Sequence, residues 1–251
     1  MQGKHVGHFG WYDLVTNDAK AAAAFYREVV GWQKQSWADG EYTLFTGPQG
    51  PLGGVIQRAG RPPHWTSYVL VNDVDATASQ ATRLGGRVYV QPNEMAGVGR
   101  YAVIADPQGA SIALFKPVGD PLALHDITKQ GEFDWNELLT TDRNKAFSFY
   151  SQIFGWQKLD EQDLEPMGTY LVYGIGDRQM GGIVTKTAEM LALPTAWIYY
   201  INIGDLDEAT KRAVANGGKV TRGPMEVPDG SHVAHLIDPQ GAEFALHEPA
   251  R

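Results

Sequence analysis

Proton-transfer chemistry could come from three side chains in the second half of the chain, namely Glu137, Glu243 and His247. Two carboxylates and an imidazole can act as general acid and base when they share a poorly hydrated space, because each then shifts the pKa of the others. The same groups could instead hold a divalent metal ion, or form a solvated rim with a structural role. All three readings depend on which faces of which strands carry these residues.

A second type of chemistry, the binding of flat molecules, is suggested by Trp residues followed closely by carboxylates. Glu137 lies two residues after Trp135, and Asp13 lies two residues after Trp11. Since alternate residues of a strand share a face, each Trp and its carboxylate should point the same way. This suits a flat apolar ligand stacked on the indole, with its polar group bound by the carboxylate. The competing interpretation is that these rings only fill the core.

Two copies of one pattern must position these residues. Residues 7–34 match residues 131–158 at an offset of 124, and from Trp65 onward the offset is 132. The matching features are Phe25/Phe149, Tyr26/Tyr150, Gly31/Gly155, Trp32/Trp156, Trp65/Trp197, and the blocks DPQGA at 106–110 and 238–242. Each copy reads as strands interrupted by two helices; in the first copy one helix ends at Gly31 and the other starts after Asp75. We therefore expect an α+β chain with domains at 1–120 and 130–251, joined by a linker at 121–129.

The order of these motifs resembles the vicinal oxygen chelate superfamily, which includes glyoxalase I, extradiol dioxygenases and bleomycin- and fosfomycin-resistance proteins. The elements T-x-D, FY, GW, V-x-D, LGG and DP-x-G occur in this order in the first copy. The second copy keeps the order, with IGD and NGG in place of V-x-D and LGG, and the two copies cover nearly the whole chain. The resemblance implies tandem βαβββ modules, four in all, which pair into two glyoxalase-like domains. It also implies that each domain forms a half-open β-barrel around a cavity.

The metal-binding positions of the family carry poor ligands in this chain. Carried over by their distance from the motifs, they are Trp11, Ser67, Ala113 and Gly53 or Gly54 in the first copy, and Trp135, Tyr199, Ala245 and Gly181 or Gly182 in the second. Of these only Tyr199 could bind a divalent ion, and weakly. The sequence therefore predicts no metal at the usual family positions and no cofactor, with a displaced divalent metal in the second domain as the alternative.

Strand alternation from those positions predicts which side chains line the cavities. The expected ligand-binding residues are Trp11, Asp13, Trp65, Ser67, Phe115, Trp135, Trp197 and Tyr199, and the expected catalytic residues are Glu137, His247 and Glu243. A tight DPQG hairpin would also place His232 opposite His247. The predicted function is metal-independent binding of a small planar or apolar molecule. The alternative is a lyase or isomerase that uses Glu137, Glu243 and His247.

The amino-acid composition limits the classes of molecule that the chain is expected to bind. The formal net charge is −8 and there is no basic run, which argues against nucleic acid and anionic membranes as partners. The absence of cysteine excludes disulfides and thiolate chemistry. No signal peptide or long apolar segment is recognisable, so we expect a cytoplasmic protein with a small-molecule ligand.

Overall fold

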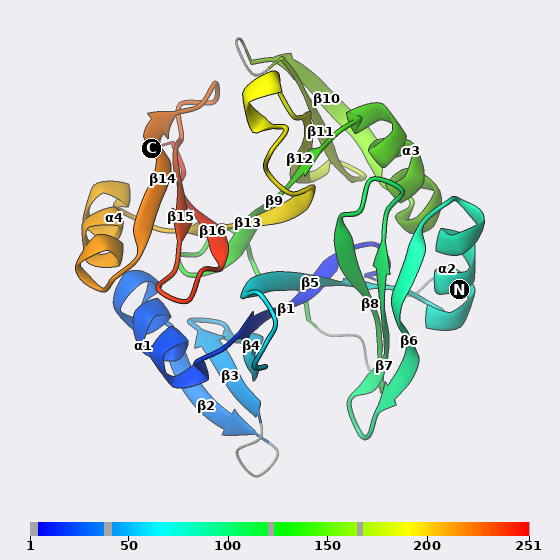
Figure 1. The fold of residues 1–251 in the computed structure, drawn as a ribbon, viewed down its shortest axis with the longest axis horizontal. Helices are drawn as coiled ribbons and strands as arrows, with labels where there is room; N and C mark the ends of the chain where they lie inside the picture. The colour runs from blue at the N-terminus through cyan, green and yellow to red at the C-terminus, as the bar shows by residue number, and fades with distance from the viewer. Residues whose placement is uncertain (1–4, 38–41, 120–122, 165–167, 251) are drawn as a thin grey trace. The chain divides into compact units, whose positions relative to one another are not determined.

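The computed structural model describes residues 5–37, 42–119, 123–164 and 168–250. These residues form two eight-stranded mixed sheets and four α-helices (Figure 1). Residues 120–122, where the first predicted domain ends and the predicted linker begins, lie outside the described residues.

The two sheets have the same strand order. The first runs β2-β3-β4-β1-β5-β8-β7-β6 and the second runs β10-β11-β12-β9-β13-β16-β15-β14. The first sheet contains β1 (Phe9–Thr16), β2 (Gln33–Trp37), β3 (Tyr42–Gly47), β4 (Gly50–Gln57), β5 (His64–Leu70), β6 (Arg87–Met95), β7 (Gly99–Ala105) and β8 (Ser111–Pro117). The second contains β9 (Phe133–Thr140), β10 (Gln157–Asp163), β11 (Thr169–Ile175), β12 (Arg178–Thr185), β13 (Ala196–Asn202), β14 (Lys219–Glu226), β15 (His232–Ile237) and β16 (Glu243–Glu248).

Each repeat contributes two α-helices in addition to its sheet. These are α1 (Ala19–Val30) and α2 (Val74–Arg83) in the first repeat, and α3 (Arg143–Phe154) and α4 (Leu206–Ala215) in the second, with a short 3₁₀ turn at η2 (Ala188–Met190). The predicted α+β fold of four βαβββ modules is thereby confirmed. Among the described residues neither sheet closes into a barrel, because β2 and β6, or β10 and β14, remain as its edges.

The repeated residues around the first helix of each copy set where that helix begins and ends. Asp18 and Asp142 are N-caps, and their carboxylates accept hydrogen bonds from Ala21 N at 2.9 Å and from Lys145 N at 3.0 Å. The other ends are closed by Gly31 and Gly155, which adopt left-handed φ values of 84° and 74°. Helix α2 starts two residues earlier than expected, because Asp73 rather than Asp75 caps it.

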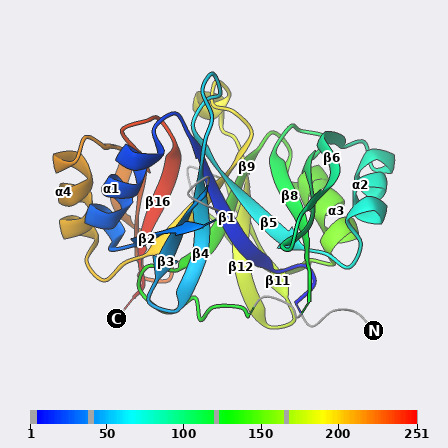
Figure 2. The same cartoon turned by 90° about the horizontal axis from the view of Figure 1, so that it is seen from below.

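The chain divides into two compact units that cut across the sequence repeats. The first unit holds the described residues of Met1–Gly10, Ser67–Leu124 and Asn136–Trp197, and the second holds Trp11–Thr66, His125–Trp135 and the described residues of Ile198–Arg251. Thus α2 and α3 lie side by side in the first unit, and α1 and α4 in the second (Figure 2). Each sheet follows one repeat while each unit combines both, so the domain limits 1–120 and 130–251 stay a prediction.

Within each unit the repeated motifs of one copy bond to those of the other. In the second unit Trp32 Nε1 donates to Gly131 O at 2.7 Å, and Tyr26 OH donates to Asp238 Oδ2 at 3.3 Å. In the first unit Trp156 Nε1 donates to Gly7 O at 2.7 Å, and Tyr150 OH donates to Asp106 Oδ2 at 3.2 Å. The GW, FY and DPQG motifs therefore recur because they join modules of different copies.

Candidate functional site

One face of β13, β14, β15 and β16 gathers an apolar cluster and two imidazoles. The strand register places Tyr200 beside Ala245 and Ala245 beside His235, which makes one row across the sheet. The neighbouring row runs from Asn202 through His247 and Val233 to Met225. Ile198, Tyr200, Val233 and Ala245 are buried together, and Trp135, Met225 and Val227 pack against them. We call this surface, all within the second unit, the β13–β16 face.

Tyr200 and His235 are joined across this face. The Tyr200 hydroxyl and His235 Nε2 are hydrogen bonded at 3.1 Å, although their strands are not neighbours. The strand between them carries Ala245 at this row, and its methyl group is small enough for the Tyr200 ring to pass over it. A small residue at 245 is thus required by the Tyr200–His235 contact, whatever else binds there.

His247 is held by a carboxylate from β9. Its Nδ1–H donates to Asp134 Oδ2 at 2.6 Å, and the two side chains are only 19% and 7% exposed. Burial raises the pKa of the Asp134 carboxyl. Burial alone would lower the pKa of His247, but the hydrogen bond and charge of Asp134, with a smaller effect of Asp229, raise it. A hydrogen-bonded proton therefore lies between His247 and Asp134, two mostly buried side chains.

This geometry leaves Nε2 as the reactive atom of His247. Asp134 occupies Nδ1, which fixes the tautomer of a neutral ring so that Nε2 carries the lone pair. Within the part of the chain that the structure describes, Nε2 has no protein partner. His247 can therefore exchange a proton, or donate a hydrogen bond when charged, at an atom on the same face as the apolar cluster.

The predicted catalytic carboxylates do not join His247 in this arrangement. Glu243 is exposed and lies opposite Ile237 at the start of β16, and that it lines a cavity with His247 stays a prediction. Glu137 accepts a hydrogen bond from Tyr170 OH at 2.8 Å in the first unit, whereas His247 belongs to the second. That Glu137 and His247 line one cavity stays a prediction.

The expectation for His232 is also wrong by one residue. His232 lies opposite Glu248, and Val233 is the residue opposite His247. The cause is the DPQG loop, which spans the five residues between the strand ends because Asp238 Oδ1 accepts hydrogen bonds from Gln240 N, Gly241 N and Ala242 N. A five-residue loop shifts the pairing by one and turns His232 to the other face.

The predicted Trp–carboxylate pairing holds for Trp11 and Asp13. Trp11 Nε1 donates both to Asp13 Oδ1 and to Tyr42 OH at 3.0 Å, and the Tyr42 hydroxyl donates to the same Asp13 oxygen. Burial, reinforced by the Asp13 charge, raises the pKa of Tyr42 far above its ordinary value. Asp13 is thus 5% exposed and already carries two donors from its own unit, so it is not left for a ligand's polar group as we expected.

Trp65 and Trp197 serve the core. Trp65 Nε1 donates to Tyr26 OH at 2.9 Å, and Trp197 Nε1 donates to Tyr150 OH at 3.2 Å. Both indoles are buried and pack on aromatic residues of the helix layer, such as Trp32 and Trp156. Their expected place in ligand cavities is therefore wrong, and the core interpretation of the sequence holds for these two rings.

Ser67 and Tyr199 are on the opposite face from the one expected. The parallel register pairs Tyr68 with Ala113 and Tyr200 with Ala245, so Ser67 and Tyr199 point away from those alanines. Ser67 is fully buried, and Tyr199 packs on Tyr12 and Phe133. Phe115 lies on the Ala113 face, where it is buried beside Leu70 and contacts Tyr68. The residues missed by sequence reasoning are Asp134, Tyr200, Asn202 and His235.

The donor set at the family's metal positions does not fit a metal ion. The face that contains Ala113 or Ala245 carries Thr66 or Ile198 in place of the expected Ser67 or Tyr199. At the glycine positions, a Cβ on Gly54 would meet the Tyr42 hydroxyl at 2.0 Å, and a Cβ on Gly182 would meet the Tyr170 ring at 2.0 Å. Tyrosine rings thus occupy the space that a metal-binding side chain at either glycine position would need. Across the residues that the structure describes, no group of three His, Asp or Glu side chains could hold a metal.

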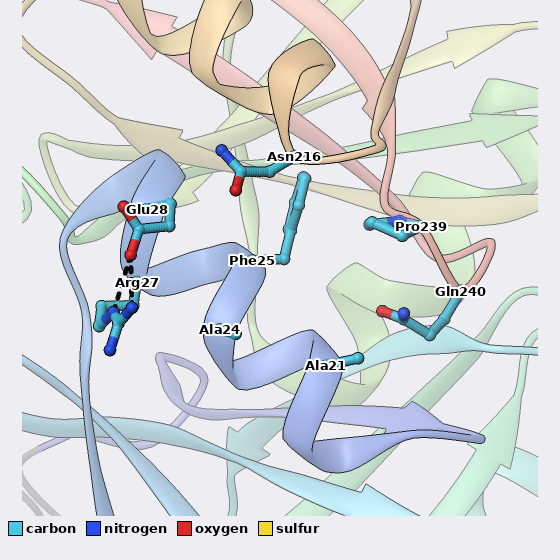
Figure 3. A pocket seen from close by; sticks show the side chains of 8 residues that line it. All are labelled: Ala21, Ala24, Phe25, Arg27, Glu28, Asn216, Pro239 and Gln240. Atoms are coloured by element: carbon cyan, nitrogen blue, oxygen red, sulfur yellow. Dashed lines mark hydrogen bonds and ion pairs between the residues drawn. The ribbon is translucent and has the colours of Figure 1, made fainter.

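A separate surface hollow of about 380 Å³ lies between α1, the end of α4 and the second DPQG loop (Figure 3). Phe25 forms part of its wall, and its two charged side chains, Arg27 and Glu28, pair with each other at 2.6 Å. Its remaining lining is Ala21, Ala24, Asn216, Pro239 and Gln240. Because its two charged side chains are exposed and pair with each other, this hollow offers less chemistry than the β13–β16 face does.

Comparison with known proteins agrees with the fold. The model of the glyoxalase/bleomycin resistance protein/dioxygenase superfamily matches residues 132–246, and that of a glyoxalase-like domain matches residues 12–115. "Putative glyoxylase CFP32" of Mycobacterium tuberculosis is 31% identical over 96% of this chain and 94% of its own length. Anthracycline biosynthesis protein DnrV of Streptomyces peucetius is 31% identical over 95% and 92%. The chain therefore belongs to the glyoxalase/bleomycin resistance/dioxygenase superfamily.

Solved structures show the same architecture. The Mn(II)-bound glyoxalase from Novosphingobium aromaticivorans matches with a TM-score of 0.67 at 14% identity, covering 100% of this chain and 84% of that one. The 2,3-dioxygenase LapB from Pseudomonas sp. KL28 matches with a TM-score of 0.66 at 13% identity, covering 98% and 93%. At these identities the likeness concerns the fold alone. In the described part of the chain, no helix has the length and apolar character needed to cross a membrane.

Proposed function

We propose that this chain is a glyoxalase-like protein that binds a small planar or apolar molecule without a divalent metal, and that the β13–β16 face is the binding surface. The observation that carries the proposal is Trp135, half-buried against Ile198, Tyr200, Val233 and Ala245. An indole beside a buried apolar floor favours a flat ring system by stacking and apolar burial.

The relative DnrV supports this ligand class. Its name places it in the biosynthesis of anthracyclines, which contain a flat, fused-ring anthraquinone chromophore. The residues at the metal positions support the metal-free part of the proposal, since none of them is a histidine or a carboxylate, the usual ligands of a divalent ion. Trp135 then replaces metal coordination by stacking as the means of holding a ligand.

The test uses 2-methoxyanthraquinone, a flat probe with no ionisable group, titrated against the intrinsic Trp fluorescence. We expect saturable binding, weakened about tenfold or more by Trp135→Ala through loss of ring stacking. Trp37→Ala is the matched control, since that indole is 47% exposed on the edge strand β2. Elemental analysis of protein purified without chelator should find far less than one divalent metal per chain. Equal binding by Trp135→Ala and wild type, or one metal per chain, would contradict the proposal.

A second candidate is catalysis of a lyase or isomerase type, favoured by the Asp134–His247 hydrogen bond. His247 would be the base, and Glu137 and Glu243 stay the carboxylates predicted to take part in this chemistry. If the candidate is right, Glu137→Gln abolishes turnover of a confirmed substrate and leaves the fold intact. If the chain only binds, that change weakens the ligand modestly.

A further inference from the structure

The β13–β16 face combines a site for a flat ring with one directed imidazole. His247 lies directly beside Val233 in the register, and Val233 belongs to the buried cluster that supports Trp135. A ring on that floor would therefore have one edge close to His247. Strands β13, β15 and β16, which carry these residues, run side by side (Figure 1).

The surroundings of His247 favour an oxygen that can lose a proton. The charged groups that act on it are Asp134 from β9 and Asp229 from the loop between β14 and β15, both negative. These carboxylates stabilise an imidazolium, and Asp134 directs its free N–H along Nε2. A cation held in a mostly apolar space binds an anionic oxygen more strongly than a neutral ether, because water competes poorly there.

We propose that this face selects planar molecules that carry a weakly acidic hydroxyl group, a phenol or an enol, whose proton passes to His247 Nε2 while Asp134 holds the imidazole in place. The O–H bond breaks, the Nε2–H bond forms, and the bound pair is an oxyanion and an imidazolium. The same complex forms from imidazolium and free phenolate, so no further reactant is needed. Asp134 is a positioning residue in this scheme. The inference rests on the proposed binding function and adds the ligand class to it.

The experiment compares 2-hydroxyanthraquinone with 2-methoxyanthraquinone, which differ only at the acidic hydroxyl. The phenolate of the first probe absorbs at longer wavelength than the phenol, so its spectrum reports the proton. For the wild-type protein we expect the hydroxy probe to bind about tenfold more tightly. We also expect it to show the phenolate spectrum at a pH where the free probe is still the phenol.

Asp134→Asn and His247→Gln should each remove the preference and the spectral change while keeping the binding of 2-methoxyanthraquinone. Glu243→Gln, which removes an exposed carboxylate of the same strand, should change nothing. If either variant is poorly folded, the combination Asp134→Gly, Asn202→Leu and His247→Phe replaces it, because the first repeat folds with those residues at the matching positions.

The outcomes separate the two proposals. Equal affinity for both probes, a phenol spectrum in the complex, or an unchanged preference in Asp134→Asn would overturn the present inference and leave the binding function standing. Failure of both probes to bind the wild-type protein would overturn the binding function, and this inference with it.

Discussion

The two repeats carry side chains of different chemistry at three equivalent positions of the same fold. In the first unit Gly10, Leu70 and Phe115 meet, with Leu70 beside Phe115 in the register and so close to Gly10 that a Cβ there would approach its side chain at 3.0 Å. In the second unit the corresponding positions are Asp134, Asn202 and His247, with Asn202 beside His247 and Asp134 bonded to it. In the first unit these positions are filled by carbon side chains, whereas in the second they contain the hydrogen bond between His247 and Asp134.

The frame around these positions is the same in both units. Trp65, Tyr26 and Asp238 form one hydrogen-bonded series, and Trp197, Tyr150 and Asp106 form its counterpart. Each series links modules from both repeats within one unit. Shared residues thus build the fold twice, whereas the three positions named above differ and place the Asp134–His247 pair in the second unit.

Placing an imidazole among Gly10, Leu70 and Phe115 in the first unit should have the largest effect. Phe115→His should lower the free energy of unfolding by about 3 kcal/mol, because it removes a buried ring and leaves a polar group beside Leu70 without an acceptor. Urea denaturation measures the loss. Tyr89→His, at a side chain 56% exposed, is the control and should cost little. Equal stability of Phe115→His and wild type would show that the first unit is not closed there.

Removing the Asp134 carboxylate, which binds His247 in the second unit, should have the next largest effect. Asp134→Ala is expected to cost about 2 kcal/mol of unfolding free energy, since His247 then loses its partner in a mostly buried place. In a double-mutant cycle with His247→Phe the two changes should be non-additive by about 1–2 kcal/mol. Additive costs would mean that the 2.6 Å contact contributes nothing to stability.

The pH dependence of stability should distinguish the two units. Because the pKa of His247 is raised in the folded state above its ordinary 6.5, its stabilising contribution is complete below that value and is lost as the pH rises through the folded pKa. The stability advantage of wild type over His247→Phe should therefore shrink as the pH rises above about 6.5. Chemical denaturation at several pH values measures it. A growing advantage would give the pKa shift the opposite sign.

The smallest effect is expected for the carboxylate that sequence reasoning placed in the site. Glu243→Gln should change the free energy of unfolding by less than about 0.5 kcal/mol, because Glu243 is exposed and lies opposite Ile237 at the far end of β16. Thermal unfolding of the variant and of wild type, run in parallel, checks this. A larger loss would show that Glu243 makes a stabilising contact that its exposure does not suggest.

Sequence patterns predicted the elements whose causes are local. The caps at Asp18 and Gly31 act within one helical turn, so their spacing alone locates α1. Strands β2 and β6 are hard to predict from the sequence because they are sheet edges with mostly exposed residues, and a strand with no buried face shows no clear alternation. The family resemblance identified the superfamily, since its motifs are the residues that join the modules.

The sequence by itself determined that the chain is a tandem of βαβββ modules and that the usual metal positions carry poor ligands. Only the tertiary structure decided which face each strand presents, because a register shift of one residue exchanges the faces, as it did for Ser67 and Tyr199. It alone brought Asp134 to His247 over 113 residues of chain. No local pattern encodes such a contact, since it depends on how distant strands are aligned.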